Sequence, residues 1–227
     1  MEPNGAEPAQ KPMNKITPPD ATPTRARRQL LGGVAAMLAA PVFIRDVFAQ
    51  QSLRLTPSQT EGPFYPVSLP ADHDFDLLTQ GSTQYAQGQA TWLEGSVTDA
   101  AGRPVRDAVV EIWQCDAQGH YHHPGDGGRA DPAFQGFGRV SVDSNGAYRF
   151  RTIRPSKYSG RTPHIHVKVR LARRDLLTTQ LYVEGDPDNE RDGLWRRLGA
   201  ADRAALTVPF EKADAGLRAR FAIVVAA

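Results

Sequence analysis

The chain has 227 residues, of which 23% are charged and 40% are hydrophobic, and this length suits one substantial domain with a full core. Residues 1–49 contain six of the 27 basic and four of the 25 acidic residues, so the remainder carries 21 of each and is formally neutral. Because residues 50–227 have neither a net positive charge nor a run of Lys and Arg, the composition argues against nucleic-acid binding.

The first 49 residues have the pattern of an export leader. Arg27 and Arg28 precede an apolar run rich in Gly and Ala, residues 30–40, and residues 47–49 fit a cleavage site. The run is about half the roughly 20 residues that span a bilayer, so we expect no stable membrane span. The pattern predicts a twin-arginine-type signal and a periplasmic or extracellular protein, whose folded domain is residues 50–227. An ordinary secretory signal and an uncleaved anchor are the alternatives. Because twin-arginine export resembles the route of proteins that fold around a cofactor, it also indicates a prosthetic group.

From residue 92 onward the chain has the pattern of short strands. Apolar and polar residues alternate in segments separated by Gly, Pro, Asp and Asn, and no long helical period interrupts them. Asn145 and Gly146 lie between two such segments, 138–143 and 147–153, which predicts a hairpin. The other segments are residues 92–97, 108–113, 164–171, 178–185, 205–210 and 220–225. The pattern predicts an all-β protein, an antiparallel β-sandwich.

Three irregular stretches interrupt the strands: residues 56–90, 116–137 and 154–163. The second is too long and too rich in Gly for a hairpin turn, and the third leads directly into the segment 164–171. Long loops on a rigid sandwich commonly hold functional sites, so we look for the chemistry of this protein there.

His164 and His166 are two residues apart in a predicted strand. Since alternate residues of a strand point the same way, the two imidazoles lie side by side on one face. Alone, such a pair is as consistent with a surface pair as with a metal site. Two tyrosines strengthen the second interpretation: Tyr158 precedes His164 by six residues, and Tyr121 lies in the loop 116–137. Three further histidines surround Tyr121: His120, His122 and His123. Such clusters from separate loops indicate a metal centre.

The residue types at this centre favour iron(III) over zinc. Cys115 is the only cysteine and lies in a strand-like run, so it is interpreted as a buried apolar residue, and a cysteine-rich zinc site is excluded. Tyrosine loses its proton near pH 10 in water, so only a strongly Lewis-acidic ion holds it as a phenolate at neutral pH. Two phenolates with two neutral imidazoles offset most of a 3+ charge.

Three segments occur in an order that resembles the intradiol ring-cleavage dioxygenases, the family of catechol and protocatechuate dioxygenases. They are residues 113–126 (WQCDAQGHYHHPGD), 148–169 (YRFRTIRPSKYSGRTPHIHVKV) and 178–187 (TTQLYVEGDP). The resemblance covers residues 56–186 and is closer to the protocatechuate type, because the N-terminal part is short and poor in helix. It implies a prealbumin-like sandwich and a non-haem Fe(3+) centre. The implied metal ligands are Tyr121, Tyr158, His164 and His166.

The resemblance also implies the reaction: O2 cleaves a catechol-type ring between its two hydroxylated carbons, giving a cis,cis-muconate-type diacid. Tyr158 matches the ligand that leaves the metal and takes up a proton when substrate binds. Arg161 is then expected to stabilise negative charge on the substrate, and Gln180 to orient it. Only two residues separate Tyr158 from Arg161, fewer than in better-studied members, which predicts a more open pocket. We expect its walls to come from Phe64, Tyr65 and residues 126–137. No role follows for His73, His120, His122 or His123.

A second class of function stays open, because residues 95–113 also resemble prealbumin-like binding modules. The protein would then be an exported accessory module without catalysis. A dioxygenase fold that has lost its activity is disfavoured, since all four ligand residues are present. The sequence leaves open the ring substituents of the substrate and the oligomeric state, a homo-oligomer included.

Overall fold

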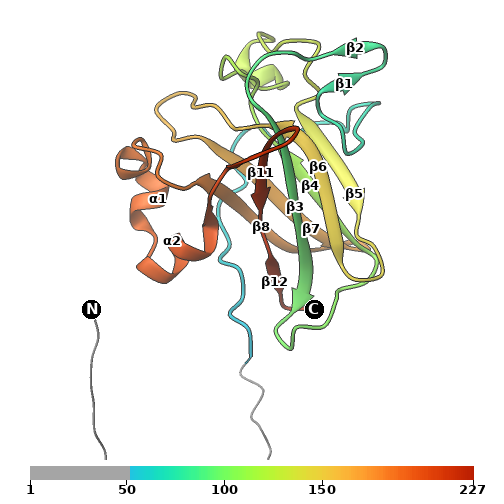
Figure 1. The fold of residues 1–227 in the computed structure, drawn as a ribbon, viewed down its shortest axis with the longest axis vertical. Helices are drawn as coiled ribbons and strands as arrows, with labels where there is room; N and C mark the ends of the chain where they lie inside the picture. Colours follow the sequence, from blue (N-terminus) through green and yellow to red (C-terminus); the bar gives the residue numbers. More distant parts are fainter. Residues whose placement is uncertain (1–51) are drawn as a thin grey trace, which may run out of the picture. The chain divides into compact units, whose positions relative to one another are not determined.

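The computed structural model describes residues 52–227, in which two five-stranded sheets form a β-sandwich (Figure 1). The all-β class predicted from the sequence is confirmed, while the predicted leader, residues 1–49, lies outside the described residues. The strands are β1 (Thr79–Gln80), β2 (Thr83–Gln84), β3 (Ala90–Asp99), β4 (Ala108–Trp113), β5 (Phe137–Ser141), β6 (Ala147–Ile153), β7 (His164–Leu171), β8 (Arg174–Val183), β9 (Thr207–Val208), β10 (Glu211–Ala213), β11 (Gly216–Arg220) and β12 (Ile223–Val225). The helices are two single 3₁₀ turns, η1 (Pro124–Asp126) and η2 (Asn189–Arg191), and two short α-helices, α1 (Gly193–Arg197) and α2 (Ala200–Leu206). Within residues 52–227 no helix is long and apolar enough to cross a membrane.

The first sheet has the order β5-β4-β7-β8-β9 and carries the two histidines. β4, β5, β7 and β8 pair antiparallel, and the short β9 adds to β8 in parallel. Along β7, Ile165 and Val167 belong to the core between the sheets. His164 and His166 alternate with these core residues and therefore share the outer face of this sheet.

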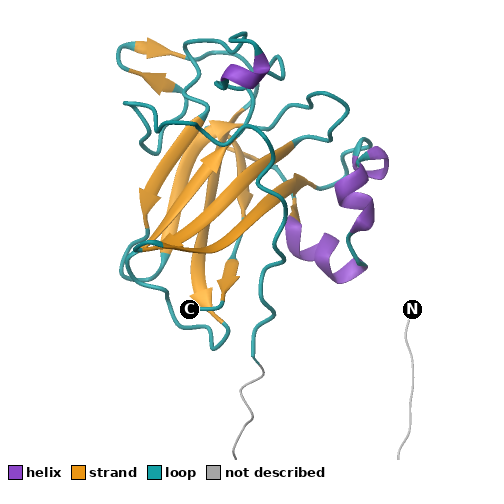
Figure 2. Cartoon of the chain, turned by 180° about the vertical axis from the view of Figure 1, so that it is seen from behind, coloured by secondary structure: helices purple, strands orange, loops and turns teal. Residues whose placement is uncertain are grey.

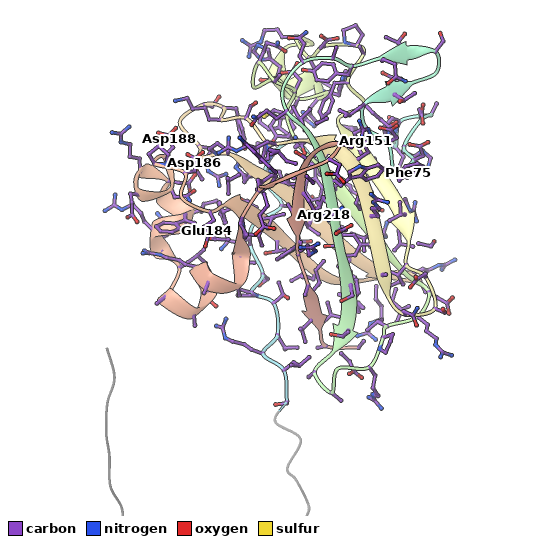
Figure 3. The ribbon with its side chains drawn as sticks, viewed as in Figure 1. Phe75, Arg151, Glu184, Asp186, Asp188 and Arg218 are labelled. Carbon is purple, nitrogen blue, oxygen red and sulfur yellow. The ribbon has the colours of Figure 1, made fainter. Side chains whose placement is uncertain are left out.

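The second sheet is built around the long strand β3. β6 pairs antiparallel with one side of β3, whereas β11 and β12 pair in parallel with two successive parts of β3. The long strands therefore pair antiparallel with one another, as predicted, whereas β9, β11 and β12 pair with long strands in parallel. The face of this sheet that points away from the core carries Arg151 and Arg218, with the exposed Phe75 next to Arg151 (Figure 3).

The main core lies between the two sheets and is filled by apolar side chains from both. Fully buried members are Leu93, Val97, Phe150, Val110, Ile112, Ile165, Val167 and Leu181. Every second residue of the long strands thus faces inward, which is the period that the sequence showed. Burial of these side chains fixes the register of the strands, and with it the residues on the outer face.

The predicted hairpin at Asn145 and Gly146 is wrong. The chain does turn there, because the Asp143 carboxylate accepts hydrogen bonds from the backbone N–H groups of Asn145 and Ala147, both at 2.8 Å. However, β5 pairs with β4 and β6 pairs with β3, so the turn carries the chain from one sheet to the other. Turn chemistry determines where the chain reverses, whereas the partner of each strand depends on the core that it can help to bury.

The predicted strands 205–210 and 220–225 are also only partly correct. Ala200–Leu206 is helical, as its alanines favour, and only Thr207–Val208 pairs with β8 before Pro209, which has no N–H to donate. Of the predicted strand 220–225, only Ile223–Val225 forms β12, while Arg220 is the last residue of β11, most of which lies outside the prediction. β10 is a strand that the sequence pattern did not indicate.

Residues 53–60 run along the edge of the sandwich from the second sheet to the first (Figure 2). The Thr56 N–H donates to the Val224 carbonyl at 2.9 Å, and the Gln59 N–H donates to the Thr178 carbonyl of β8 at 2.8 Å. This path brings the following residues, 61–65, over the outer face of the first sheet, where the histidines lie.

Candidate metal centre

One row of side chains crosses the outer face of the first sheet and forms the floor of the site. Phe137 of β5 pairs with Trp113 of β4, Trp113 pairs with His166 of β7, and His166 pairs with Gln180 of β8. The indole of Trp113 and the imidazole of His166 are stacked, with ring centroids 4.7 Å apart and planes at 8°. The position of His166 therefore follows directly from the register of the sheet.

The two histidines point their Nε2 atoms at the same place. These atoms are 3.2 Å apart, and both side chains are buried. Nδ1 of His164 lies 2.6 Å from the Thr162 carbonyl, while Nδ1 of His166 is buried with no hydrogen-bond partner. A proton at Nδ1 of His164, donated to that carbonyl, leaves Nε2 with a free lone pair.

The protein environment keeps both imidazoles neutral. Burial, with the charge of Arg161 as a smaller cause, lowers the pKa of His164 to about 4. Burial also lowers the pKa of His166 well below its usual value, and His164 and Arg161 act in the same direction. Neutral imidazole is the form that binds a metal, so the pair is ready to act as two nitrogen ligands at pH 7.

The two tyrosines lie beside the histidines. The Tyr121 and Tyr158 rings meet edge to face, with centroids 4.9 Å apart. Tyr158 is 5.5 Å from the His164 ring, and Tyr121 is 6.1 Å from the His166 ring, both between centroids. Tyr121 is buried and its hydroxyl has no partner at hydrogen-bonding geometry, whereas Tyr158 is half-buried. Burial raises the pKa of both phenols, and for Tyr158 the charge of Arg161 partly opposes this effect.

Local backbone structure brings the two tyrosine loops together. The buried Asp116 carboxylate accepts hydrogen bonds from the N–H groups of Gln118, His120 and Asp131, which holds the loop 116–131 in place. Gly119 has φ of 86°, and a Cβ on it would lie 2.6 Å from the Lys157 carbonyl oxygen. The Tyr121 loop can therefore approach the Tyr158 loop this closely only with glycine at position 119.

A tight turn joins Tyr158 to Arg161. The Arg161 N–H donates to the Tyr158 carbonyl at 2.7 Å, and the two residues between them, Ser159 and Gly160, both have positive φ. This is the backbone of a two-residue turn of the I′ kind. It places Arg161 directly beside Tyr158 with no further insert between them.

Arg161 is held from two sides. Its Nε donates to an Asp192 carboxylate oxygen at 2.6 Å and its Nη2 donates to Oε1 of Gln180 at 2.7 Å. Gln180 also accepts from the Tyr182 hydroxyl at 3.1 Å and donates through Nε2 to the Thr60 carbonyl at 2.9 Å. The amide of Gln180, expected to orient substrate, is thus engaged with the protein and holds Arg161.

Residues 61–65 cover the site with two aromatic side chains. Phe64 stacks on Tyr121 with centroids 4.6 Å apart and meets Tyr158 edge to face at 5.7 Å. Tyr65 packs edge to face on Trp113 at 5.0 Å and donates its hydroxyl to the buried Glu111 at 2.8 Å. The two residues expected as pocket walls thus contact residues of the site, Phe64 the two tyrosines and Tyr65 the indole of Trp113.

The other expected wall, residues 126–137, contributes less. Phe137 packs against Tyr65 with centroids 6.1 Å apart, but Phe134 is part of the main core and packs on Tyr85. Cys115 is buried beside this cluster, as predicted, and burial raises the pKa of its thiol to about 12.

The four remaining described histidines do not join the centre. His120 lies 3.4 Å from Asp126, and His123 caps η1 by accepting from the Gly125 N–H at 3.0 Å. A ring nitrogen of His122 is 3.0 Å from the Asp131 carbonyl, and one of His73 is 2.8 Å from the Pro70 carbonyl. Across residues 52–227 no three His, Cys, Asp or Glu side chains gather in a way that could hold a metal ion. The candidate centre therefore depends on the tyrosines.

The residues present fit a trivalent iron ion. Two nitrogens bound to one ion at roughly 2.1 Å each are about 3 Å apart when they are adjacent ligands, close to the 3.2 Å between the two Nε2 atoms. The buried Tyr121 hydroxyl has no partner at hydrogen-bonding geometry, and because burial raises the pKa of both phenols, only a strong Lewis acid would hold them as phenolates. Fold and centre together define a β-sandwich that brings two tyrosines and two histidines together on the outer face of one sheet, a set of side chains that fits non-haem iron.

Comparison with known proteins agrees with this class. Residues 60–224 match a family model described as "Dioxygenase". A hydroxyquinol 1,2-dioxygenase of Corynebacterium glutamicum is 38% identical over 123 residues, 46% of this chain and 40% of the relative. The protocatechuate 3,4-dioxygenase beta chain of Burkholderia cepacia is 36% identical over 155 residues, 62% of this chain and 64% of the relative. This chain thus spans about 40 to 64% of the length of these two relatives.

A solved structure extends the similarity to three dimensions. The dioxygenase domain of a dioxygenase carbohydrate-binding protein fusion from Streptomyces sp. SirexAA-E has a TM-score of 0.60 and 32% sequence identity. The match covers 75% of this chain and 97% of that domain. This chain belongs to the intradiol ring-cleavage dioxygenase family.

Two residues of the site were missed at the level of sequence: Asp192 and Trp113. Asp192 precedes a short helix as an N-cap, a signal that the sequence contains, but its contact with Arg161 joins positions 31 apart. Trp113 was part of a quoted motif, and the pairing of β4 with β7 is what places it on His166.

Proposed function

We propose that this protein is an intradiol dioxygenase that holds iron(III) and uses O2 to cleave a catechol-type ring. The bond between the two hydroxylated carbons breaks, and both atoms of O2 enter the product, a cis,cis-muconate-type diacid. The observation that carries the proposal is the convergence of Tyr121, Tyr158, His164 and His166 beside Arg161. The names of the relatives, which act on hydroxyquinol and protocatechuate, support it.

The four ligand residues have different tasks. Iron(III) bound there would act as a Lewis acid and a template that shifts electron density onto the catechol ring. His164 and His166 are fixed by the sheet and neutral at pH 7, so they form the rigid half of the site. Tyr121 is buried beneath Phe64 and supplies a permanent phenolate.

Tyr158 is the ligand suited to be displaced by substrate. It is half-buried, and the turn that follows it, Ser159 and Gly160, is exposed, so its side chain has room to swing outward. Away from a metal, the raised pKa of Tyr158 would favour the neutral phenol, so its hydroxyl oxygen would hold a proton given up by the catechol. Tyr121, packed on all sides, has no such freedom.

Arg161 supplies fixed positive charge beside the reacting ring. Its side chain is only 20% exposed, and its contacts with Asp192 and Gln180 hold the guanidinium in one orientation. A guanidinium keeps its charge at any pH that the protein meets, so it stabilises negative charge that builds up on the substrate.

The visible absorption spectrum of the purified, iron-loaded protein tests the proposal. We expect a broad tyrosinate-to-iron(III) charge-transfer band that shifts when a catechol is added without O2. With 18O2, the diacid product should then contain two labelled atoms. A protein that stays colourless after iron(III) is added would refute the tyrosine ligands and leave the binding module as the better interpretation.

We further propose that residues 1–49 export the protein by the twin-arginine route, with Arg27 and Arg28 as the support for this step. Replacement of both by Lys should retain the protein in the cytoplasm of a bacterial host, whereas the unchanged leader delivers it outside. Equal export of both forms would favour an ordinary secretory signal.

A further inference from the structure

Asp192 is a fully buried carboxylate at the edge of the candidate site. One of its oxygens accepts from Nε of Arg161 at 2.6 Å and from the Thr162 N–H at 3.1 Å. The other accepts from the Leu194 and Trp195 N–H groups, both at 2.9 Å. Every hydrogen bond to this carboxylate thus comes either from the Arg161–Thr162 segment or from the first turn of α1.

The two ends of this arrangement are anchored in different parts of the fold. Asp192 is the N-cap of α1, and Arg161 follows the turn that carries Tyr158. Nη2 of Arg161 then continues to Gln180 on β8, and Gln180 donates to the Thr60 carbonyl on the segment that covers the site. The guanidinium therefore lies between a helix terminus and the sheet, with a defined partner on each side.

Charge explains why a carboxylate occupies position 192. Burial by itself would lower the pKa of Arg161, but its hydrogen bond and charge interaction with Asp192 outweigh this effect and raise it. Burial likewise would raise the pKa of Asp192, but its contacts with Arg161 and with the N–H groups of Trp195 and Thr162 hold this pKa below the usual value. Each group is stable as an ion in this buried place because the other is there.

We infer that Asp192 is a positioning residue for the reaction: it fixes the Arg161 guanidinium beside Tyr158, in the orientation in which it meets the substrate. The inference rests on the proposed function, because Arg161 has a catalytic task only if this centre cleaves a catechol. Misplacement of a catalytic group by about 1 Å can cost around 100-fold in rate, so release of Arg161 should lower turnover far more than substrate binding.

The test uses a variant that keeps the helix cap and removes the partner of Arg161. In Asp192→Ser the serine oxygen is a favoured N-cap for α1 but is too short to reach Arg161 as well. Asp186→Ser is the matched control, because it breaks another Arg–Asp pair of the same loop, the partly buried contact with Arg154 at 2.9 Å, and leaves Arg161 with both of its partners. We expect kcat for catechol to fall roughly 10- to 100-fold in Asp192→Ser, with iron content and anaerobic catechol affinity within about twofold of wild type. The control, Asp186→Ser, should match wild type in kcat, iron content and anaerobic catechol affinity.

Two further measurements separate positioning from a merely structural role. In an Arg161→Met background, Asp192→Ser should lower kcat by no more than about twofold, because methionine has neither the charge nor the N–H groups through which Asp192 acts. In the full chain without added iron, NMR of the Arg161 Nε–H should show slow exchange with solvent in wild type and fast exchange in Asp192→Ser. If Asp192→Ser does not fold, the isosteric Asp192→Asn is read in the same way.

The outcomes distinguish this inference from the proposed function. Equal loss of kcat in both backgrounds, or unchanged exchange at Nε–H, overturns the positioning role while the dioxygenase activity of wild type stands. Wild type that shows neither the iron band nor ring cleavage overturns the proposed function, and the NMR result then still reports whether Asp192 holds Arg161.

Discussion

Trp113 and His166 lie face to face across neighbouring strands, with ring planes at 8° and centroids 4.7 Å apart. Trp113 is buried, and Tyr65 packs on it edge to face, so the indole is itself held in place. The imidazole of His166 has no hydrogen bond at Nδ1 to fix its rotation. Packing against Trp113 therefore fixes the orientation of the His166 ring, as the contact with the Thr162 carbonyl does for the His164 ring.

From this relationship we predict that Trp113→Leu weakens iron binding by about 10-fold or more, the usual effect of losing a group that orients a ligand. Competition with an iron chelator measures this affinity. Trp92→Leu is the matched control, since Trp92 lies on the outer face of the second sheet under Arg149. Equal losses of iron affinity in both variants would show that the stack has no special role.

Tyr121→Phe should affect stability and metal binding in opposite directions. The Tyr121 hydroxyl is buried with no partner at hydrogen-bonding geometry, Tyr158 being the nearest phenol, and such a group costs on the order of 1 kcal/mol or more in the folded state. The metal-free variant should therefore be as stable as wild type or more stable by about 1 kcal/mol in urea unfolding. With iron, the variant should lose much of the charge-transfer band. A clear loss of stability without metal would show that the hydroxyl has a structural partner.

The stability of the metal-free protein should depend on pH through the two histidines. The folded-state pKa of His164, about 4, lies below the usual value of 6.5, and that of His166 is lowered as well. Between these values the unfolded chain binds more protons than the folded one, so stability is full above pH 6.5 and falls as pH decreases toward 4. For His164 alone the loss reaches on the order of 3 kcal/mol. Urea unfolding at pH 7.0, 5.5 and 4.5 measures it, and a His164→Gln, His166→Gln variant should show a much flatter profile.

The parts of this structure that the sequence predicted are those governed by local rules. The period of two along residues 164–171 placed His164 and His166 on one face, and burial of Cys115 followed from its strand-like surroundings. The clusters of His and Tyr in separate loops indicated a metal centre, but the choice of Tyr121 and Tyr158 as its ligands came from the resemblance, since no spacing rule joins residues of different loops. The prediction of a hairpin at Asn145 was wrong because the residues of a turn do not determine which strands pair with each other. Asp192 and the engagement of Gln180 with Arg161 depend on side-chain contacts that only the assembled fold creates.

Gly119 offers a test of how the two tyrosine loops are held together. Its φ of 86° is unfavourable for any residue with a Cβ, and a Cβ there would also lie 2.6 Å from the Lys157 carbonyl oxygen. Gly119→Ala therefore combines backbone strain with a collision that pushes the Tyr158 loop away from the Tyr121 loop. Gly128→Ala is the matched control, because Gly128 lies in the same long loop with φ of 67° and has nothing within 4 Å of the added Cβ.

The strain at positive φ costs each variant about 1 kcal/mol or more of unfolding free energy, so the difference between the two isolates the contact with Lys157. We expect Gly119→Ala to be the less stable by a further 1 to 3 kcal/mol, roughly the cost of overpacking. It should also bind iron more weakly and lose intensity in the charge-transfer band, while Gly128→Ala keeps both. If the two variants differ neither in stability nor in the band, the close approach at Gly119 is not what brings Tyr121 and Tyr158 to one metal.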